Sequence, residues 1–259
     1  MDLPVYIWLP VYFNSMFSIA RTYKENDKNC SLSMYRYFES LSNILPNKFF
    51  KTHFKLFLKL DRSVINVLLN LDVLNSFFTA FPSIKDILIN NPSEFLNQCY
   101  NNNELMFMYV YLMYIYMSYI QNELGYKIHY NTYFDLKKIY NPNQLTTIDW
   151  GRPTWFVIHI SSLYSEKTPS LLYDYKQFLE SLQYILPCQK CQEHLRENLK
   201  FITFDDCGKT DLDLFRCSWK LHNIVNRSLN KYTPSFEEAL NYYSIDNLKK
   251  NTRLFSYSI

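Results

Sequence analysis

Glycine is nearly absent from this chain, and its scarcity restricts both the fold and the chemistry. The 259 residues contain three glycines, Gly125, Gly151 and Gly208. Neither a GxGxxG dinucleotide fingerprint nor a Walker-type phosphate loop can therefore occur, so any nucleotide cofactor has to be held by helices and side chains. Because alternating apolar segments are few and several apolar segments have a helical period, the sequence predicts an all-α protein.

The composition is that of a globular chain with a large core. Hydrophobic residues make up 48% of the sequence, which is enough for one large or two small domains. The 27 basic and 24 acidic residues give a formal charge of +3 and form no long block of either sign. This balance argues against a nucleic-acid partner.

Two apolar stretches have to be distinguished from membrane segments. Residues 3–20 follow Asp2 rather than a basic region, contain Pro4 and Pro10, and lack a small-residue cleavage site, so they predict a buried helix. Residues 105–120 fall short of the roughly 18 residues of a membrane span and carry five tyrosines, so they predict a core helix. We expect no signal peptide and no membrane span.

The sequence PCQKCQEH at residues 187–194 carries the main chemical signal. Its two cysteines follow a proline and precede good helix formers, which places them at the first turn of a helix. The unpaired N–H groups of a helix start stabilise a thiolate, so a redox dithiol is one interpretation. Half of a zinc site is another, with Cys207, Cys217, His194 and His222 as further ligands, and two ordinary buried cysteines are a third.

The first quarter of the chain resembles the region around this cysteine pair. Pro10 aligns with Pro153, Pro46 with Pro187 and His53 with His194. At the chemical positions the first copy is empty, because Asn47, Phe50 and Met16 stand opposite Cys188, Cys191 and His159. The hypothesis is an intrachain pseudo-dimer, in which a degenerate helical bundle packs against an active one. A chance likeness between amphipathic helices is the alternative.

The rest of the pattern gives the domain organisation. Residues 63–81 and 83–95 look like one or two helices added to the first copy, and the polar segment 129–143 is the expected linker. The two domains would span residues 1–140 and 141–259. In the second, helices are expected to start near Thr146, to span 171–186, to start at Cys188 and to span 212–231. Four such helices can hold a flat cofactor in their core.

Three motifs then resemble a known family. WGRPTWFVIH, PCQKCQEHL and LHNIVNRSLNK are similar, in order and spacing, to the signatures of Erv/ALR-type FAD-linked sulfhydryl oxidases, over about residues 149–236. A degenerate copy ahead of an active one is most like the sulfhydryl oxidases of baculoviruses and related large insect DNA viruses. The resemblance implies an Erv-type four-helix bundle that binds FAD, preceded by a cofactor-free bundle.

The resemblance also implies roles for residues. Cys188 and Cys191 would be the redox disulfide, with Cys191 beside the flavin and Cys188 open to exchange. Electrons would pass from substrate thiols through this pair to FAD and then to O2, giving H2O2 and a disulfide in a protein substrate. The implied FAD contacts are Trp150, Arg152, Trp155, His159, His194, His222, Asn223, Asn226 and Lys231. No metal is expected.

The expected partners are thiol-containing proteins, O2 and a second copy of the chain. For a viral protein the expected location is the host cytoplasm or nucleus, and the virion. Two rival hypotheses are a zinc-stapled scaffold without enzymatic activity and a virion or membrane-associated helical protein whose oxidase site has decayed.

The chain departs from the family at one feature. Relatives of the mitochondrial enzymes carry a structural disulfide between the positions that are Trp219 and Phe236 here. Cys207 and Cys217 are candidates for a replacement bridge or for a shuttle pair. Cys30 and Cys99 are expected to be free and buried.

Overall fold

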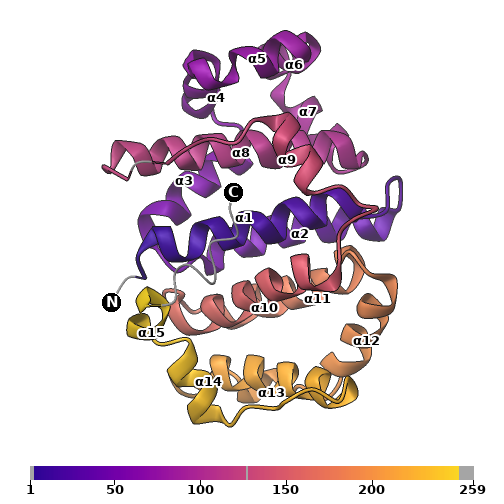
Figure 1. Ribbon diagram of the computed structural model, residues 1–259, viewed down its shortest axis with the longest axis vertical. Helices are drawn as coiled ribbons and strands as arrows, with labels where there is room; N and C mark the ends of the chain where they lie inside the picture. The colour runs from indigo at the N-terminus through magenta and orange to yellow at the C-terminus, as the bar shows by residue number, and fades with distance from the viewer. Residues whose placement is uncertain (1–2, 127, 251–259) are drawn as a thin grey trace.

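The computed structural model describes residues 3–126 and 128–250, and in these residues the protein is all-helical, as predicted, with no β-strand (Figure 1). The α-helices are α1 (Val5–Thr22), α2 (Lys28–Ile44), α3 (Lys48–Leu58), α4 (Arg62–Asn70), α5 (Asn75–Ala80), α6 (Pro82–Asn90), α7 (Pro92–Cys99), α8 (Asn103–Glu123), α9 (Tyr133–Ile139), α10 (Thr147–Tyr164), α11 (Leu171–Ile185), α12 (Gln189–Leu199), α13 (Asp213–Ser228), α14 (Phe236–Tyr242) and α15 (Ile245–Lys250). Two short 3-10 helices are η1 (Asp72–Leu74) and η2 (Phe204–Asp206).

The four predicted helices of the second half are present. α10 begins after Thr146, which forms a capping box with Asp149, and α12 begins after Cys188. The last of the four, α13, ends at Ser228 rather than at residue 231. It ends there because Asn230 adopts a left-handed backbone conformation with a φ of 52°.

The insertion in the first half is more broken than predicted. Four helices, α4 to α7, lie where the sequence indicated one or two. Pro82 and Pro92 occupy the first turns of α6 and α7, and the side chains of Asp61 and Asn91 cap α4 and α7. Because each of these residues starts a new helix, the apolar segments become short helices.

The predicted linker at residues 129–143 contains a helix, α9, so the prediction is wrong for that part. Thr132 caps this helix by accepting the backbone N–H of Asp135. The ring of Tyr133 packs against Phe77 and Phe107 at centroid distances of 5.3 and 5.7 Å. The tyrosine-rich segment is thereby held in the core of the first half. The domain boundary near residue 140 stays a prediction.

Both long apolar stretches form the helices expected of them, α1 and α8, and most of their residues are buried. Among the described residues, no single helix has the length and apolar character to cross a membrane. The bent pair Arg62–Asn70 and Asp72–Ala80, with 77° between its parts, meets the criteria of length and composition only.

The two halves of the chain meet along four helices (Figure 1). α1 packs against α10, and α2 packs against α11. Polar contacts join them: the buried hydroxyl of Tyr12 lies 2.7 Å from Oγ of Ser161, and Nδ2 of the half-buried Asn43 donates to Oδ1 of Asp174 at 3.1 Å. The first two helices of each half are therefore partners, which supports the pseudo-dimer hypothesis. The duplication itself stays a prediction.

The starts of α3 and α12 also correspond. The side chain of Asn47 caps α3 by accepting the backbone N–H of Phe50 at 3.1 Å. Sγ of Cys188 caps α12 by accepting the backbone N–H of Cys191 at 3.2 Å. The two residues that the alignment places opposite the cysteines thus have the same local geometry, without the sulfur chemistry.

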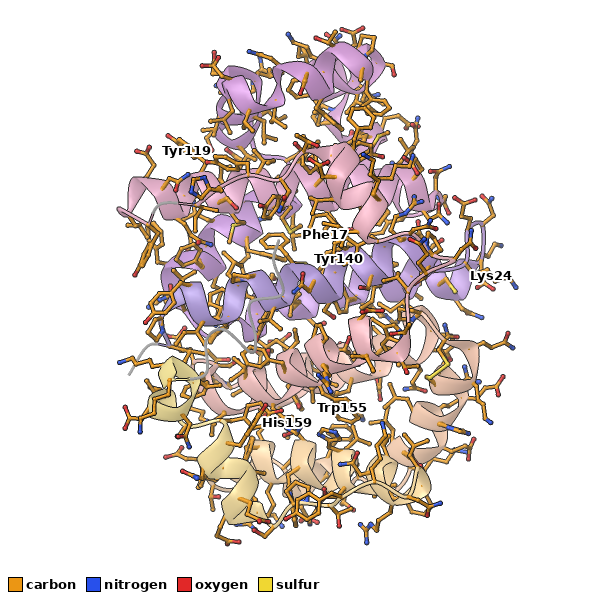
Figure 2. All side chains as sticks on the ribbon, in the orientation of Figure 1. Phe17, Lys24, Tyr119, Tyr140, Trp155 and His159 are labelled. Carbon is orange, nitrogen blue, oxygen red and sulfur yellow. A yellow bond between two sulfur atoms is a disulfide. The ribbon has the colours of Figure 1, made fainter. Side chains whose placement is uncertain are left out.

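Among the described residues, the first half has no counterpart of the polar and aromatic ring pair at the positions aligned with the first motif. Tyr12 and Met16, which align with Trp155 and His159, are buried. The next residue of α1 is Phe17, whose ring stacks on that of Tyr140 with centroids 5.2 Å apart (Figure 2). This packing is what a degenerate copy that has lost a cofactor is expected to show.

Candidate active site

The two cysteines of the CxxC sequence form a disulfide at the start of α12. Their Cα atoms are 5.1 Å apart, and both side chains are half-buried. Sγ of Cys188 accepts the backbone N–H of Cys191, and the positive end of the helix dipole lies at the same place. Both features stabilise a thiolate. The local structure of the pair therefore favours thiol–disulfide exchange.

An aromatic stack joins α10 to α13. The rings of Trp155 and His222 are parallel within 2°, with their centroids 3.9 Å apart. Nε2 of His159 lies 2.8 Å from Nδ1 of His222. Trp155 and His159 share the side of α10 that faces α13, as their spacing of four predicts. Three of the predicted cofactor contacts are thus brought together.

Both imidazoles of this stack are neutral near pH 7. Burial, together with the neighbouring His222, holds the pKa of His159 well below its ordinary value. Burial and then the charge of Lys231 lower the pKa of His222 to about 4. The single hydrogen bond between the two rings therefore contains one proton, carried by either His159 or His222.

Sequence reasoning missed two residues that hold His159. Oγ of Ser218 lies 2.9 Å from Nδ1 of His159, and the ring of Tyr243 lies 4.7 Å from the imidazole. Ser218 precedes His222 by four residues, so helix periodicity could have indicated it. Tyr243 follows α14 and reaches the site through tertiary packing, which no local sequence pattern indicates.

The other predicted contacts lie in different surroundings. Trp150 is buried, whereas Arg152 and His194 are exposed. Lys231 is exposed but close enough to His222 to lower its pKa, and its backbone N–H donates to the carbonyl of Asn226 at 2.8 Å. The cofactor roles of these five residues stay predictions.

Asn223 has a buried acceptor that a bound cofactor could satisfy. Its Nδ2 donates to the carbonyl of Pro234 at 2.9 Å, whereas its Oδ1 is buried without a partner in the described part of the chain. An unsatisfied buried acceptor is costly, and a bound group with an N–H or O–H would satisfy it. The orphaned oxygen and the flat ring stack therefore fit a cofactor such as FAD.

The positions of the missing family disulfide carry an aromatic contact instead. The rings of Trp219 and Phe236 meet edge to face with centroids 5.7 Å apart. Nε1 of Trp219 also donates to the carbonyl of Pro234 at 2.8 Å, and the guanidinium of Arg216 lies 3.9 Å above the ring of Phe236. Ring packing thus connects α13 to α14 where the relatives are implied to use sulfur.

Cys207 and Cys217 form the second disulfide, which joins the loop after η2 to α13, with Cα atoms 5.8 Å apart. Cys207 is fully buried and Cys217 is 7% exposed, so substrate thiols have little access to this pair. A structural bridge therefore fits better than a shuttle. All four cysteines of the zinc hypothesis are paired in disulfides, which argues against zinc ligation by their thiolates.

Removing this second bridge should destabilise the protein and leave turnover intact. For the double variant Cys207→Ala/Cys217→Ala we expect the free energy of unfolding to fall by about 2 to 3 kcal/mol, because the bridge restricts the unfolded chain. Urea unfolding measures the loss. If the variant oxidises dithiothreitol normally but protein thiols slowly, the bridge is a shuttle and the structural interpretation is wrong.

The remaining cysteines are free and buried, as expected. The thiol of Cys30 donates to the carbonyl of Tyr184 at 3.2 Å, and that of Cys99 donates to the carbonyl of Leu105 at 3.4 Å. Burial raises the pKa of both thiols, which keeps them protonated and unreactive.

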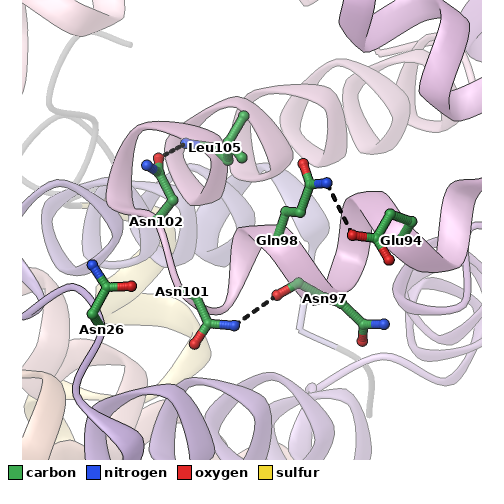
Figure 3. A pocket seen from close by; sticks show the side chains of 7 residues that line it. All are labelled: Asn26, Glu94, Asn97, Gln98, Asn101, Asn102 and Leu105. Carbon is green, nitrogen blue, oxygen red and sulfur yellow. Dashed lines mark hydrogen bonds between the residues drawn. The ribbon is translucent and has the colours of Figure 1, made fainter.

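A hollow of about 360 Å³ lies in the first half (Figure 3). Its lining is mostly amide side chains from α7, the start of α8 and the turn before α2: Asn26, Glu94, Asn97, Gln98, Asn101, Asn102 and Leu105. Three of the amides make local hydrogen bonds: Gln98 to Glu94, Asn101 to the carbonyl of Asn97, and Asn102 to the backbone N–H of Leu105. None of the predicted site residues lines this hollow.

The helical fold, the disulfide at a helix start and the ring stack define a helical domain with a candidate redox site. Residues 152–245 match the model of the Erv1 / Alr family, so the second half contains an Erv1/Alr domain, as the three motifs indicate. No solved structure gives a significant match.

Two relatives illustrate the likeness. The FAD-linked sulfhydryl oxidase ERV1 of Oryza sativa subsp. japonica is 31% identical over 98 residues, which are 37% of this chain and 50% of the relative. The FAD-linked sulfhydryl oxidase of African swine fever virus (isolate Tick/Malawi/Lil 20-1/1983) is 27% identical over 103 residues, or 37% of this chain and 81% of the relative. The chain thus spans about half the length of the rice protein. Viral proteins are among its homologues, whereas a specific link to baculoviruses stays a prediction.

Proposed function

We propose that the protein is an FAD-dependent sulfhydryl oxidase that forms disulfide bonds in thiol-containing proteins. The observation that carries the proposal is the half-buried Cys188–Cys191 disulfide at the start of α12, in the same domain as the Trp155–His222 stack. The match to the Erv1/Alr family and the names of the relatives support it.

The cysteines exchange disulfides in two steps. A substrate thiolate attacks Sγ of Cys188, which breaks the Cys188–Cys191 bond, forms a mixed disulfide and releases Cys191 as a thiolate. A second substrate thiolate then attacks the substrate sulfur, which forms the substrate disulfide and releases Cys188 as a thiolate. The backbone N–H of Cys191 is in place to stabilise this thiolate. The cysteine pair has then gained two electrons from the substrate.

The ring stack supplies a surface for the cofactor. Trp155 and His222 would hold a flat ring system, and Asn223 Oδ1 would accept a hydrogen bond from it. Lys231 would place a positive charge near its phosphates. The chemistry that bound FAD supplies is transfer of the electron pair from the reduced cysteines to O2, which yields H2O2.

The first half has a structural role in this proposal. Residues 1–140 would form a degenerate domain whose α1 and α2 cover α10 and α11 of the catalytic domain, residues 141–259. A second copy of the chain as partner, and a location in the host cytoplasm, nucleus or virion, are further parts of the proposal.

The test is a visible absorption spectrum of the purified full chain, followed by O2 consumption with dithiothreitol. We expect flavin absorbance and O2 uptake that depends on the thiol. Boiled protein with free FAD is the control for uncatalysed oxidation. A colourless chain that takes up zinc but not FAD would show that the proposal is wrong.

A further inference from the structure

A continuous row of polar atoms leads from two buried serines to the ring stack. Oγ of Ser162 lies 3.1 Å from Oγ of Ser218, which lies 2.9 Å from Nδ1 of His159. Nε2 of His159 in turn lies 2.8 Å from Nδ1 of His222. Ser162, Ser218 and His159 are buried, so neighbouring groups have to satisfy their hydrogen bonds.

Each serine hydroxyl also faces a backbone carbonyl. Oγ of Ser218 lies 2.7 Å from the carbonyl oxygen of Phe215, and Oγ of Ser162 lies 2.8 Å from that of His159. A carbonyl oxygen can only accept, and a serine hydroxyl has one proton to donate. Donation by Ser218 to Phe215 leaves its oxygen as the acceptor for Nδ1–H of His159.

We propose that Ser218 is a positioning residue that fixes His159, and through it His222, as Nδ1–H tautomers. Nε2 of His159 then accepts the Nδ1–H of His222. The Nε2 atom of His222 is left with a lone pair and acts as a hydrogen-bond acceptor at the end of the row.

The opposite arrangement satisfies fewer of the contacts. With Nε2–H on both rings, Ser218 would have to donate its one proton to Nδ1 of His159. Its oxygen would then face the carbonyl oxygen of Phe215 at 2.7 Å with no proton between the two acceptors. One further serine contact would also lack a proton. Among the five contacts named above, the one without a proton in the proposed arrangement is the longest, 3.1 Å between Ser162 and Ser218.

The tautomer assignment stands on this geometry, and only its consequence for a ligand rests on the proposed function. Because Nε2 of His222 accepts, the group of the bound cofactor that meets it has to be an O–H or N–H donor. Loss of the Ser218 oxygen would leave a buried Nδ1–H without an acceptor, which favours the Nε2–H tautomer at both rings. Nε2–H of His222 would then face the O–H or N–H donor of the cofactor, and no hydrogen bond could form between them.

Nitrogen-15 NMR of the full chain labelled at histidine distinguishes the two tautomers, in both the flavin-free and the flavin-loaded protein. The signals of the five histidines are assigned by single substitutions. We expect Nδ1–H at His159 and His222, conversion of both to Nε2–H in Ser218→Ala, and retention of Nδ1–H in Ser218→Thr. Ser162→Ala is the matched control and should keep both Nδ1–H tautomers. We expect FAD affinity to fall about tenfold in Ser218→Ala.

An Nε2–H tautomer at either histidine of the unmodified chain would overturn the proposal, and so would an unchanged Nδ1–H pair in Ser218→Ala. Nδ1–H tautomers in a chain that takes up no flavin would support the assignment and count against the proposed function alone.

Discussion

In the Cys191→Ala variant we expect thiol-dependent O2 consumption to fall by at least about a thousandfold, while the flavin absorbance of the purified protein is kept. The redox pair acts as a unit, so loss of either sulfur removes the disulfide that substrate thiols attack. The side chains of the Trp155–His222 stack come from α10 and α13, whereas Cys191 is on α12, so cofactor binding should survive. Oxygen-electrode traces and absorption spectra of the same preparation measure both effects.

The matched control is Cys30→Ala, which removes a buried thiol outside the redox pair. It should keep turnover, and Cys188→Ala should lose as much activity as Cys191→Ala. Turnover that persists in Cys191→Ala would place the electron transfer at another pair. Simultaneous loss of flavin and activity would instead mean that Cys191 also supports the cofactor site.

The sequence was sufficient for the features that depend on local spacing. Proline before the first cysteine and helix formers after the second predicted the start of α12, and the structure places Cys188 at its cap. The spacing of four between Trp155 and His159 predicted their shared face. These features need no knowledge of how helices pack, which is why they could be read from the chain.

Contacts between helices could not be derived in the same way. His159 meets His222 because α10 and α13 pack in one particular register, and no pattern within either helix sets that register. Tyr243 reaches His159 only after the turn that follows α14. Similarly, the segment of α9 looked polar, yet Tyr133 is buried because α5 and α8 supply aromatic partners. Tertiary packing decided each of these cases.

Acidification should destabilise the folded protein, because the buried histidine pair is neutral and has to take up protons. Between pH 6.5 and pH 4 we expect the free energy of unfolding to fall by about 3 kcal/mol through His222 alone. Its pKa is about 4 in the folded protein against an ordinary value of 6.5, so the unfolded chain binds more protons in this window. Each unit of pKa shift corresponds to about 1.4 kcal/mol. The contribution of neutral His222 to the free energy of unfolding is therefore present above pH 6.5 and is lost as the pH falls toward 4. His159, whose pKa is lowered in the same direction, adds to the loss.

Urea unfolding at several pH values, compared with a His222→Gln variant, isolates this contribution because the carboxylates titrate in both proteins. The variant should lose less stability than the unmodified chain over the same window. The exposed His129 provides the matched control, and His129→Gln should keep the full pH dependence. If His222→Gln and the unmodified chain lost stability equally, His222 would have to be protonated in the folded protein. The hydrogen bond to His159 would then carry a charge at acidic pH, and a pKa of His222 lowered by burial would be wrong.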